Sequence, residues 1–480
     1  MSPEEEEWSN VVDVHMDKNR RPYVVAVEQA ANMSFNKNIS FQRPKHGQIN
    51  ENQVVEWNNS ITLENEKVGM PRESSCFMEN TLDNQEIHFR TMYGLSKGFI
   101  KKDKGTAKYG AGQGIGWSGQ ACNATLNIIC NAMKIKCKGM VFCNPDGSIR
   151  VETFGDYFVD DTELGTNEMG KDPEIAIIQQ AQLNDQKHSY YWFISGGRNA
   201  VEKGLWYHLS HKFVNGRPVQ RKKNETQGEL KTKPSYSEEE VVVPQYEVDQ
   251  AHKTLGCWVC PSLCQKKQKE ELIGLCRKWS QRVVGNFLSA TEKIQAYETV
   301  LLKQLEYRLA MSCLKLTDCE EIMKYYMPQI CHGYHIQRNF ERDLCCATKK
   351  YGGLQVTHLY DLVGQQKMKF FMKHIRNDDK TGKLIKISME YTQLQIGISK
   401  PFYTQKYDQW KTIVTNTWMT HLWEYLNEAG ATLEVTDFKI PKKQRKHDEF
   451  LMDILLPHIP NKNMHYKINA CRMALNVIFL

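Results

Sequence analysis

Two adjacent carboxylates, Asp160 and Asp161, are the residues of this sequence best suited to metal chemistry. They follow a segment, Glu152–Phe158, in which apolar side chains at Phe154 and Phe158 alternate with more polar ones, a pattern typical of a strand. We expect a β-hairpin with both acids at its turn. Like charges so close together repel unless a cation or water relieves them, and hard divalent cations such as Mg²⁺ bind a few carboxylates together with phosphate oxygens. A solvated acidic turn is the simpler alternative.

A glycine-rich stretch, residues 112–119, precedes a helix-like run at Cys122–Met133. It fits the G-x-G-x-x-G spacing of dinucleotide-binding folds, in which the motif connects a buried strand to a helix. The preceding residues Lys101–Tyr109 are too polar for a buried strand, and the first acid after the motif is Asp146. We therefore reject a nucleotide-cofactor site. The glycines indicate a sharp turn or a close approach of the backbone to a ligand.

The order of these features resembles one enzyme family. The run Gly112–Ser118, then a helix, then Phe158–Asp161 is similar to motifs B and C of reverse transcriptases, specifically those of non-LTR retrotransposons. Across residues 67–480, further segments resemble the stretch before motif B, motifs D and E, and later parts of that family: Gly69–Pro71, Phe89–Ser96, Gly196–Lys203 with Trp206–Tyr207, Thr254–Gly256, Tyr351–Leu354, Leu422–Leu426 and Ile468–Leu475.

The resemblance implies an RNA-directed DNA polymerase that uses an RNA template, a DNA primer and deoxynucleoside triphosphates. Asp160 and Asp161 match the motif C carboxylates, which hold Mg²⁺ or Mn²⁺ in the family. Lys203 matches a lysine near the leaving pyrophosphate. Three further positions match motif B residues that contact the template and the incoming nucleotide: Gln113, Gly114 and Ser118.

The motif A aspartate of the family has no counterpart in this sequence. The segment Ala30–Lys37 resembles the family's Asp-Ala-x-x-Cys-Tyr-Asp-Arg pattern, with Ala30 and Asn36 in place of the two aspartates. The usual spacing would instead place motif A near Gln48, where no aspartate occurs either. Glu28 would share a strand face with Ala30, so it is the acid that could partly replace the missing metal ligand.

The family's fingers region, which precedes motif A, is also missing, and the sequence ends at Phe479–Leu480 inside a family-like segment. We therefore expect a truncated or decayed reverse-transcriptase domain of a family that performs two-metal nucleotidyl transfer, and we expect this chain to extend a primer very poorly because it lacks the motif A aspartate. The alternatives are a catalytically inactive nucleic-acid-binding remnant and a product that does not fold stably. Motif A discriminates between the first two.

A group of possible zinc ligands lies after motif E. Cys257, Cys260 and Cys264 follow His252, but their order departs from the Cys-x2-Cys-x4-His-x4-Cys spacing of retroelement zinc knuckles, so we do not expect a metal there. Packing roles are also expected for two other sets. The first set is the Cys and His residues of the helical region: Cys331, His332, His335, Cys345 and Cys346. The second set is the aromatic runs Tyr190–Phe193 and Trp206–Tyr207, which we expect to lie in strands as core residues. Base stacking is the alternative for these aromatic side chains.

The fold class expected from these elements is α+β. Residues 1–66 are polar and irregular apart from one strand at Tyr23–Val27. Residues 67–265 would form a polymerase palm, an antiparallel sheet backed by helices. Within the palm, residues 216–250 are rich in charge, Pro and Gly, which predicts a long loop.

The remaining sequence is expected to be helical. Residues 266–376 would form a helical thumb, with apolar residues at three-to-four spacing in Lys266–Val284 and Ser289–Ser312. Residues 377–480 would form a helix-rich C-terminal extension.

Composition and charge restrict the class of protein further. With 480 residues, 41% hydrophobic and 25% charged, the chain is globular and too long for one core. It has no apolar run of membrane-spanning length and no signal peptide, and its 15 cysteines are expected to be reduced, so we expect an intracellular, nuclear or cytoplasmic protein. The net charge is +7; residues 1–60 carry six bases and nine acids (−3), which leaves +10 for the rest, as suits a polyanionic partner.

Overall fold

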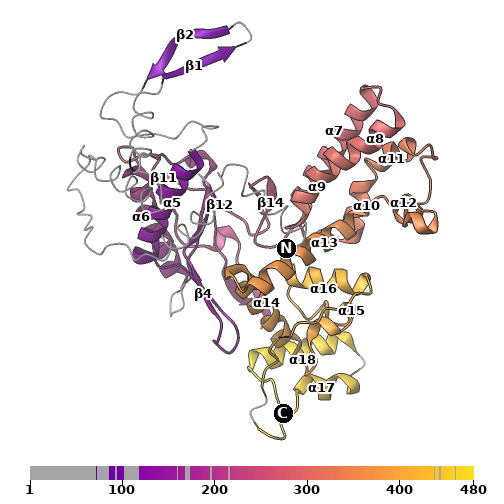
Figure 1. Cartoon of the computed structure of the whole chain (residues 1–480). Coiled ribbons are helices and arrows are strands. Elements are labelled where there is room, and N and C mark those ends of the chain that lie inside the picture. Colours follow the sequence, from indigo (N-terminus) through magenta and orange to yellow (C-terminus); the bar gives the residue numbers. More distant parts are fainter. Residues whose placement is uncertain are drawn as a thin grey trace. The chain divides into compact units, whose positions relative to one another are not determined.

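The computed structural model describes Arg72 and residues 86–91, 94–101, 118–158, 161–167, 173–194, 197–214, 217–436, 438–442, 445–459 and 461–480. The chain divides into two compact units: unit 1 comprises residues up to Tyr246 except 142–151, and unit 2 comprises residues 142–151 and 247–480. Unit 1 mixes helices with short strands, and unit 2 is mainly helical (Figure 1). The α+β character expected from the sequence is therefore confirmed at this level.

The strands of the described residues pair two by two. The pairs are β1–β2, β3–β4, β5–β6, β7–β12, β8–β9, β10–β11 and β13–β14. The β7–β12 pair is parallel. A continuous multistranded sheet, which a palm would contain, is not present in the described part of the chain. The bounds of the strands are β1 Glu86–Thr91, β2 Gly94–Lys101, β3 Met140–Cys143, β4 Arg150–Thr153, β5 Gly155–Phe158, β6 Asp161–Leu164, β7 Trp206–Tyr207, β8 His211–Val214, β9 Arg217–Gln220, β10 Lys231–Thr232, β11 Val241–Val242, β12 Gln245–Tyr246, β13 His252–Thr254 and β14 Cys257–Val259.

Helix α5 (Ser118–Lys136) begins where the sequence predicted a helix. Its apolar positions Ile128, Ile129 and Met133 are nearly fully buried. Basic side chains, including Lys134 and Lys136, occupy its last turn, where they interact favourably with the helix dipole. The antiparallel β5–β6 hairpin adds Tyr157 and Leu164 to the same apolar cluster, so this small hairpin is covered by helix on one face.

A second helix of unit 1, α6 (Pro173–Ile194), was not predicted. It contains the aromatic run Tyr190–Phe193, so the expectation that this run forms a strand is wrong, although Tyr191 and Phe193 are buried as core residues. Polar contacts attach α6 to its surroundings: the Asn184 side-chain amide donates to the Lys138 carbonyl oxygen at 2.8 Å. Apolar residues are spread around this helix instead of forming one stripe, which is why the sequence pattern missed it.

The segment 216–250 is more ordered than the long loop expected from its composition. It contains β9, β10, β11, β12 and a 3₁₀ turn, η2 (Lys223–Glu225). Thr232 and Val243 of this segment are buried, and the backbone of Lys231 bonds the Gln182 side chain of α6 in both directions. Most of the segment, up to Tyr246, therefore belongs to unit 1.

Unit 2 opens with a tight hairpin, β13–β14, at the segment that resembles motif E. Its two connecting residues, Leu255 and Gly256, both have positive φ (49° and 83°), as the two-residue turns that match the twist of a hairpin require. The Tyr307 hydroxyl donates to the Leu255 carbonyl oxygen at 2.9 Å, which attaches the turn to α9.

The predicted helix at Lys266–Val284 is confirmed as α7 (Lys266–Gly285). The predicted run Ser289–Ser312 is helical as well, but consists of α8 (Ala290–Ala296), a π-helical turn η3 (Tyr297–Leu301) and α9 (Leu302–Leu309). Ser289 caps α8, since its hydroxyl accepts from the Glu292 amide and the Glu292 carboxylate accepts from the Ser289 amide. The buried stripe Leu301, Leu305 and Leu309 faces the first core of unit 2.

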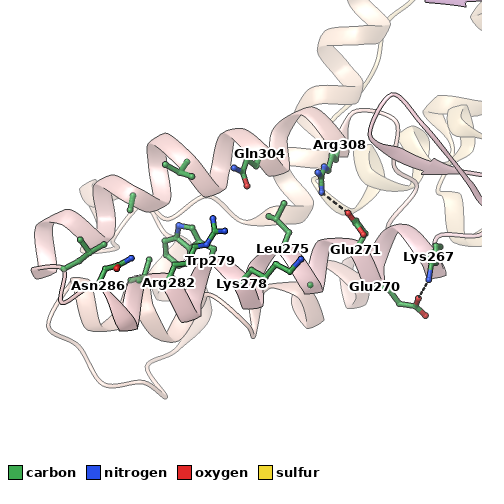
Figure 2. A pocket seen from close by; sticks show the side chains of 15 residues that line it. Lys267, Glu270, Glu271, Leu275, Lys278, Trp279, Arg282, Asn286, Gln304 and Arg308 are labelled. Atoms are coloured by element: carbon green, nitrogen blue, oxygen red, sulfur yellow. Dashed lines mark hydrogen bonds and ion pairs between the residues drawn. The ribbon is translucent and has the colours of Figure 1, made fainter. Parts of the chain in front are cut away.

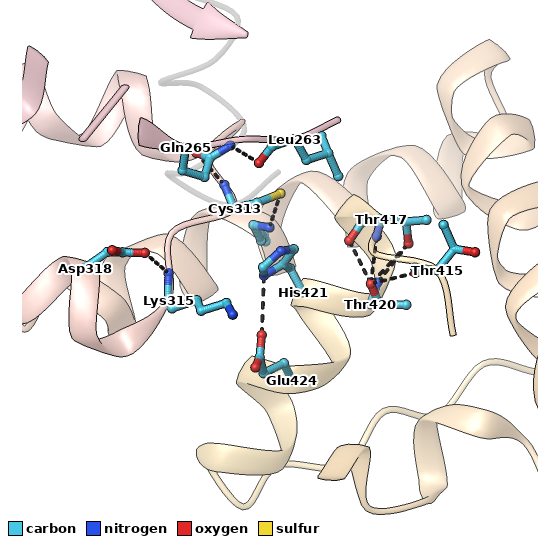
Figure 3. A network of polar contacts seen from close by, with 11 residues as sticks. Leu263, Gln265, Cys313, Lys315, Asp318, Thr415, Thr417, Thr420, His421 and Glu424 are labelled. Atoms are coloured by element: carbon cyan, nitrogen blue, oxygen red, sulfur yellow. Dashed lines mark hydrogen bonds and ion pairs between the residues drawn. The ribbon is translucent and has the colours of Figure 1, made fainter. Parts of the chain in front are cut away.

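The later helices surround a second core that includes Phe402 and Trp423, both fully buried. Polar contacts also join the segment after α9 to the start of α7 and to a later helix. Gln265 accepts from the Cys313 amide at 3.0 Å (Figure 3), and the Lys367 ammonium lies 3.5 Å from the Cys313 sulfur. The bounds of these elements are α10 Leu316–Met323, α11 Met327–Gly333, α12 Arg342–Cys346, η4 Lys349–Tyr351, α13 Leu359–Asn377, α14 Lys380–Ile396, η5 Phe402–Thr404, α15 Tyr407–Trp410, α16 Trp418–Glu428, α17 Leu451–Leu455, η6 Leu456–His458 and α18 Lys462–Ala474.

Candidate functional site

Asp161 lies at the hairpin turn that the sequence predicted. Phe158 is the cross-strand partner of Asp161, so residues 159 and 160 connect the two strands. Asp161 is exposed, and its carboxylate has no hydrogen bond or ion pair within the described residues. The predicted hairpin is confirmed for Asp161, whereas Asp160 lies outside the described residues.

The exposed face of this hairpin is acidic. Asp156 and Glu163 are direct cross-strand partners, and both are exposed together with Phe158 and Asp161. Like charges opposite each other destabilise a strand pair unless other groups compensate them, and Asp156 and Glu163 both interact with other groups. Phe154 and Phe158 do not form the regular strand pattern that we expected. Phe154 lies in a bend before β5 and is buried, while Phe158 lies in β5 and is exposed.

The opposite face of the hairpin packs on α6 through aromatic rings. Tyr157 lies 5.7 Å from the His188 ring, and His188 stacks on Trp192 at 6.2 Å (centroid distances). Burial lowers the pKa of His188 to about 4 and raises the pKa of Tyr157 far above its ordinary value. One turn earlier, burial raises the pKa of Asp185 to about 6. The ring contacts of Tyr157, His188 and Trp192 join the hairpin to the helix, whereas Asp185 interacts with Thr232 of β10.

The other predicted site residues are not gathered around Asp161 by any contact among the described residues. Ser118 is the first residue of α5, as predicted. Lys203 ends a 3₁₀ turn, η1 (Val201–Lys203), and is exposed. Gln113, Gly114 and Glu28 lie outside the described residues.

The chemistry of the donors at the turn fits a hard cation in part. An exposed carboxylate such as that of Asp161, which has no partner among the described residues, is the ligand type that Mg²⁺ prefers. Within the described ranges, no three Asp, Glu, His or Cys side chains converge as a metal site would require. Metal binding at this turn therefore remains a prediction that involves Asp160 as well.

Two of the three cysteines that follow Thr254–Gly256 pack in the interior. Cys257 and Cys260 are buried, whereas Cys264 is exposed. The Cys260 sulfur lies 3.4 Å from the Ser262 hydroxyl and 3.6 Å from the Cys264 carbonyl oxygen. Cys331 and Cys345 are likewise fully buried in the first core of unit 2.

A second candidate site, which the sequence reading missed, is a groove of about 570 Å³ in unit 2 (Figure 2). It lies between α7 and the helical run α8–η3–α9. Lys278 and Arg282 line it, and both are exposed without a hydrogen-bond or ion-pair partner in the described part of the chain. The sequence feature that could have indicated this site is the i, i+4 spacing of Lys278 and Arg282 on the solvent side of a predicted helix.

Comparison with known protein families gives no match, and neither does comparison with curated proteins. Among the residues that the structure describes, no helix is long and apolar enough to cross a bilayer.

Proposed function

We propose that this chain is a reverse-transcriptase-type protein that binds an RNA template and a DNA primer. The observation that carries the proposal is the antiparallel β5–β6 pair, in which an exposed Asp161 begins β6 opposite Phe158. The start of α5 at Ser118, after the glycine-rich run, also supports it. In this proposal Gln113, Gly114 and Ser118 contact the template and the incoming nucleotide.

The acidic turn would supply part of a two-metal nucleotidyl-transfer site. Asp160 and Asp161 would hold the cation, and Lys203 would approach the triphosphate. When bound, Mg²⁺ or Mn²⁺ would activate the primer hydroxyl and neutralise the leaving pyrophosphate. Asp161 lies on the exposed face of the hairpin, so its carboxylate is accessible to solvent.

A second candidate function is nucleic-acid binding without chemistry. It is favoured by Ala30 and Asn36, which stand where the family's motif A has its aspartates. Without that carboxylate the reacting groups would be poorly aligned, and a misplacement of about 1 Å can cost on the order of a hundredfold in rate. The two candidates share the binding step and differ in the chemical step.

Primer extension and binding measured on the same full chain test both candidates. We expect the unmodified chain to bind a primer–template with an affinity that falls steeply with salt, because lysines and arginines displace counterions from phosphates. Extension should be slow. Ala30→Asp should accelerate it, by on the order of a hundredfold if the missing carboxylate is the main defect, and both Asp160→Asn and Asp161→Asn should abolish it.

Asp156→Asn is the matched control, because it removes one charge from the same hairpin two residues before Phe158. It should leave extension unchanged. A melting temperature raised by millimolar Mn²⁺ in the unmodified chain, and not in Asp160→Asn, would give an independent sign of metal binding. No binding to primer–template at low salt would overturn both candidates. Extension that persists in Asp160→Asn would overturn the proposed catalytic role.

A further inference from the structure

The groove of unit 2 has an apolar floor. α7 forms one wall and the α8–η3–α9 run the other (Figure 2). Aliphatic side chains from both walls line it, and the Trp279 ring is 7% exposed. Its apolar lining residues are Leu275, Trp279, Val283, Leu288, Ala296 and Val300.

The apolar surface continues beyond the groove at the turn between α7 and α8. Phe287 in that turn is 98% exposed, and Val284 and Val300 are 59% and 45% exposed. Large apolar side chains exposed together next to a groove mark an interaction site more often than an ordinary surface. The end of the groove near this turn is therefore where a partner would bury the most surface.

Charge is distributed unevenly along the groove. At the end near β14, Lys267 pairs with Glu270 at 3.3 Å and Arg308 with Glu271 at 3.8 Å. Lys278 and Arg282 lie nearer the exposed apolar turn and have no such carboxylate among the described residues. Being four residues apart on one helix, they are about 6 Å apart along its axis.

We infer that this groove binds an amphipathic helix of a protein partner that carries acidic side chains along one flank of its apolar face. A helix that lies between two others can bury residues at i, i+3, i+4 and i+7 in the floor, the mode in which grooves recognise helices. Two acids spaced by four residues on the bound helix would match the spacing of Lys278 and Arg282.

The lining favours such a helix over a nucleic-acid strand. Phosphates would also pair with Lys278 and Arg282, but bases need ring faces or hydrogen-bonding groups. The floor offers mainly aliphatic side chains, and besides Trp279 the only neutral side chains of the lining that can form hydrogen bonds are Asn286 and Gln304. The single aromatic ring among the lining residues, that of Trp279, is almost fully buried. This inference is independent of the proposed polymerase-type function, because it concerns other residues and another unit.

A designed peptide tests the inference on the full chain. The probe is a fluorescent peptide of about 20 residues, long enough to be helical, with leucines at i, i+3, i+4 and i+7 and glutamates on the flanks. Its anisotropy should rise on binding. The double variant Lys278→Glu/Arg282→Glu should weaken binding about tenfold at low salt and should bind a lysine-flanked version of the peptide more tightly than the unmodified chain does.

Two further variants separate the site from general charge effects. Lys266→Glu reverses an exposed charge on the same helix outside the groove and should leave binding unchanged. Val300→Glu places a charge in the partly exposed floor and should abolish binding of the glutamate-flanked peptide. Both Lys278 and Arg282 are exposed, so unchanged circular dichroism is expected for their variants.

Three outcomes would overturn the inference. The first is no binding of the glutamate-flanked peptide to the unmodified chain. The second is an equal loss of binding in Lys266→Glu and in the double variant. The third is a fluorescent single-stranded oligonucleotide that binds and is weakened by the double variant while the peptide does not bind, which would assign the groove to nucleic acid.

Discussion

His188 and Asp185 are two titratable groups on one buried face of α6, and burial moves their pKa values in opposite directions. The pKa of His188 falls from 6.5 to about 4, whereas the pKa of Asp185 rises from 3.8 to about 6. Within the part of the chain that the structure describes, the Nε2 atom of His188 and the Oδ2 atom of Asp185 have no hydrogen-bond partner. Both side chains are therefore held in their neutral forms near pH 5.

These shifts predict opposite pH dependences of stability. The unfolded chain binds a proton at His188 below pH 6.5, but the folded chain does so only near pH 4. The contribution of neutral His188 to the free energy of unfolding is therefore complete above pH 6.5 and is lost as the pH falls. Asp185 keeps its proton up to about pH 6 in the folded chain. Its contribution to the free energy of unfolding is therefore complete below pH 3.8 and is lost as the pH rises. Each change amounts to about 3 kcal/mol.

We expect the two contributions to offset each other between pH 4 and 6 in the unmodified chain. In Asp185→Asn, the free energy of unfolding should fall by about 3 kcal/mol as the pH is lowered from 6.5 to 4. In His188→Phe, it should rise over the same range. Urea unfolding at several pH values measures both, and parallel curves for the two variants would contradict the opposing shifts.

At the residue scale, a feature was predictable where a pattern of neighbouring residues determines it. Asp161 was placed at a hairpin turn because strand alternation and adjacent acids can both be read within a dozen residues. The burial of Asp185 and His188 could not be read, because it depends on the aromatic ring of Tyr157 and on the distant strand β10. Glu28, Gln113 and Gly114 remain untested predictions.

At the scale of elements, one glycine sets how closely two helices pack. A β-carbon added to Gly364 of α13 would lie 2.1 Å from the ring of Tyr425 on α16, and that ring packs edge-on against Tyr360 at 5.5 Å. In contrast, a β-carbon on Gly274 of α7 would meet no atom within 4 Å. The same substitution should therefore have opposite effects at the two positions.

We expect Gly364→Ala to lower the free energy of unfolding by about 1–3 kcal/mol through overpacking, despite the better helix propensity of alanine. Gly274→Ala should raise it by about 0.5–1 kcal/mol. Thermal and urea unfolding measure both. Removing the Tyr425 ring also removes the overpacking, so the double variant Gly364→Ala/Tyr425→Ala should be more stable than Tyr425→Ala alone. An increase in stability for Gly364→Ala would mean that Tyr425 moves aside freely.

Helices could be predicted from the sequence where their apolar residues recur with the helical period. The stripe Leu272, Cys276, Trp279 and Val283 of α7 is buried as its spacing predicted. α6 was missed because polar contacts and aromatic residues around the helix replace a stripe. The segment 216–250 was read as a loop because its short strands are stabilised by α6 and by buried residues far away in sequence.

At the scale of the whole molecule, the chain consists of two units with separate cores. Met133 of unit 1 and Leu305 of unit 2 are both fully buried, and they belong to different apolar clusters. A truncation to alanine at either position leaves a cavity and costs about 2–5 kcal/mol in the unit concerned. The two substitutions therefore serve as labels for the two units.

We expect thermal unfolding of the full chain to show two transitions, since each core is cooperative within itself. Met133→Ala should lower the midpoint of one transition and Leu305→Ala that of the other, as measured by differential scanning calorimetry. A single transition lowered by both substitutions would show that the two units unfold together.

The α+β character and the helical second unit followed from composition and periodicity along the chain. A polymerase palm does not follow from them, because it requires strands to pair across long sequence separations, which local patterns do not encode. The observed pairs are mostly hairpins between neighbouring strands. The palm therefore remains part of the proposed function.

The π-helical turn between α8 and α9 has a consequence for how this protein tolerates change in length. Such a turn contains one residue more than the α-helical turn it replaces. Deleting a residue from an ordinary helix rotates everything that follows by about 100°. Deleting Thr299, which is exposed, would instead convert η3 into α-helix and leave Leu305 and Leu309 facing the core. Deletion of one codon usually disrupts the packing of a helix, whereas at this position the protein should tolerate it.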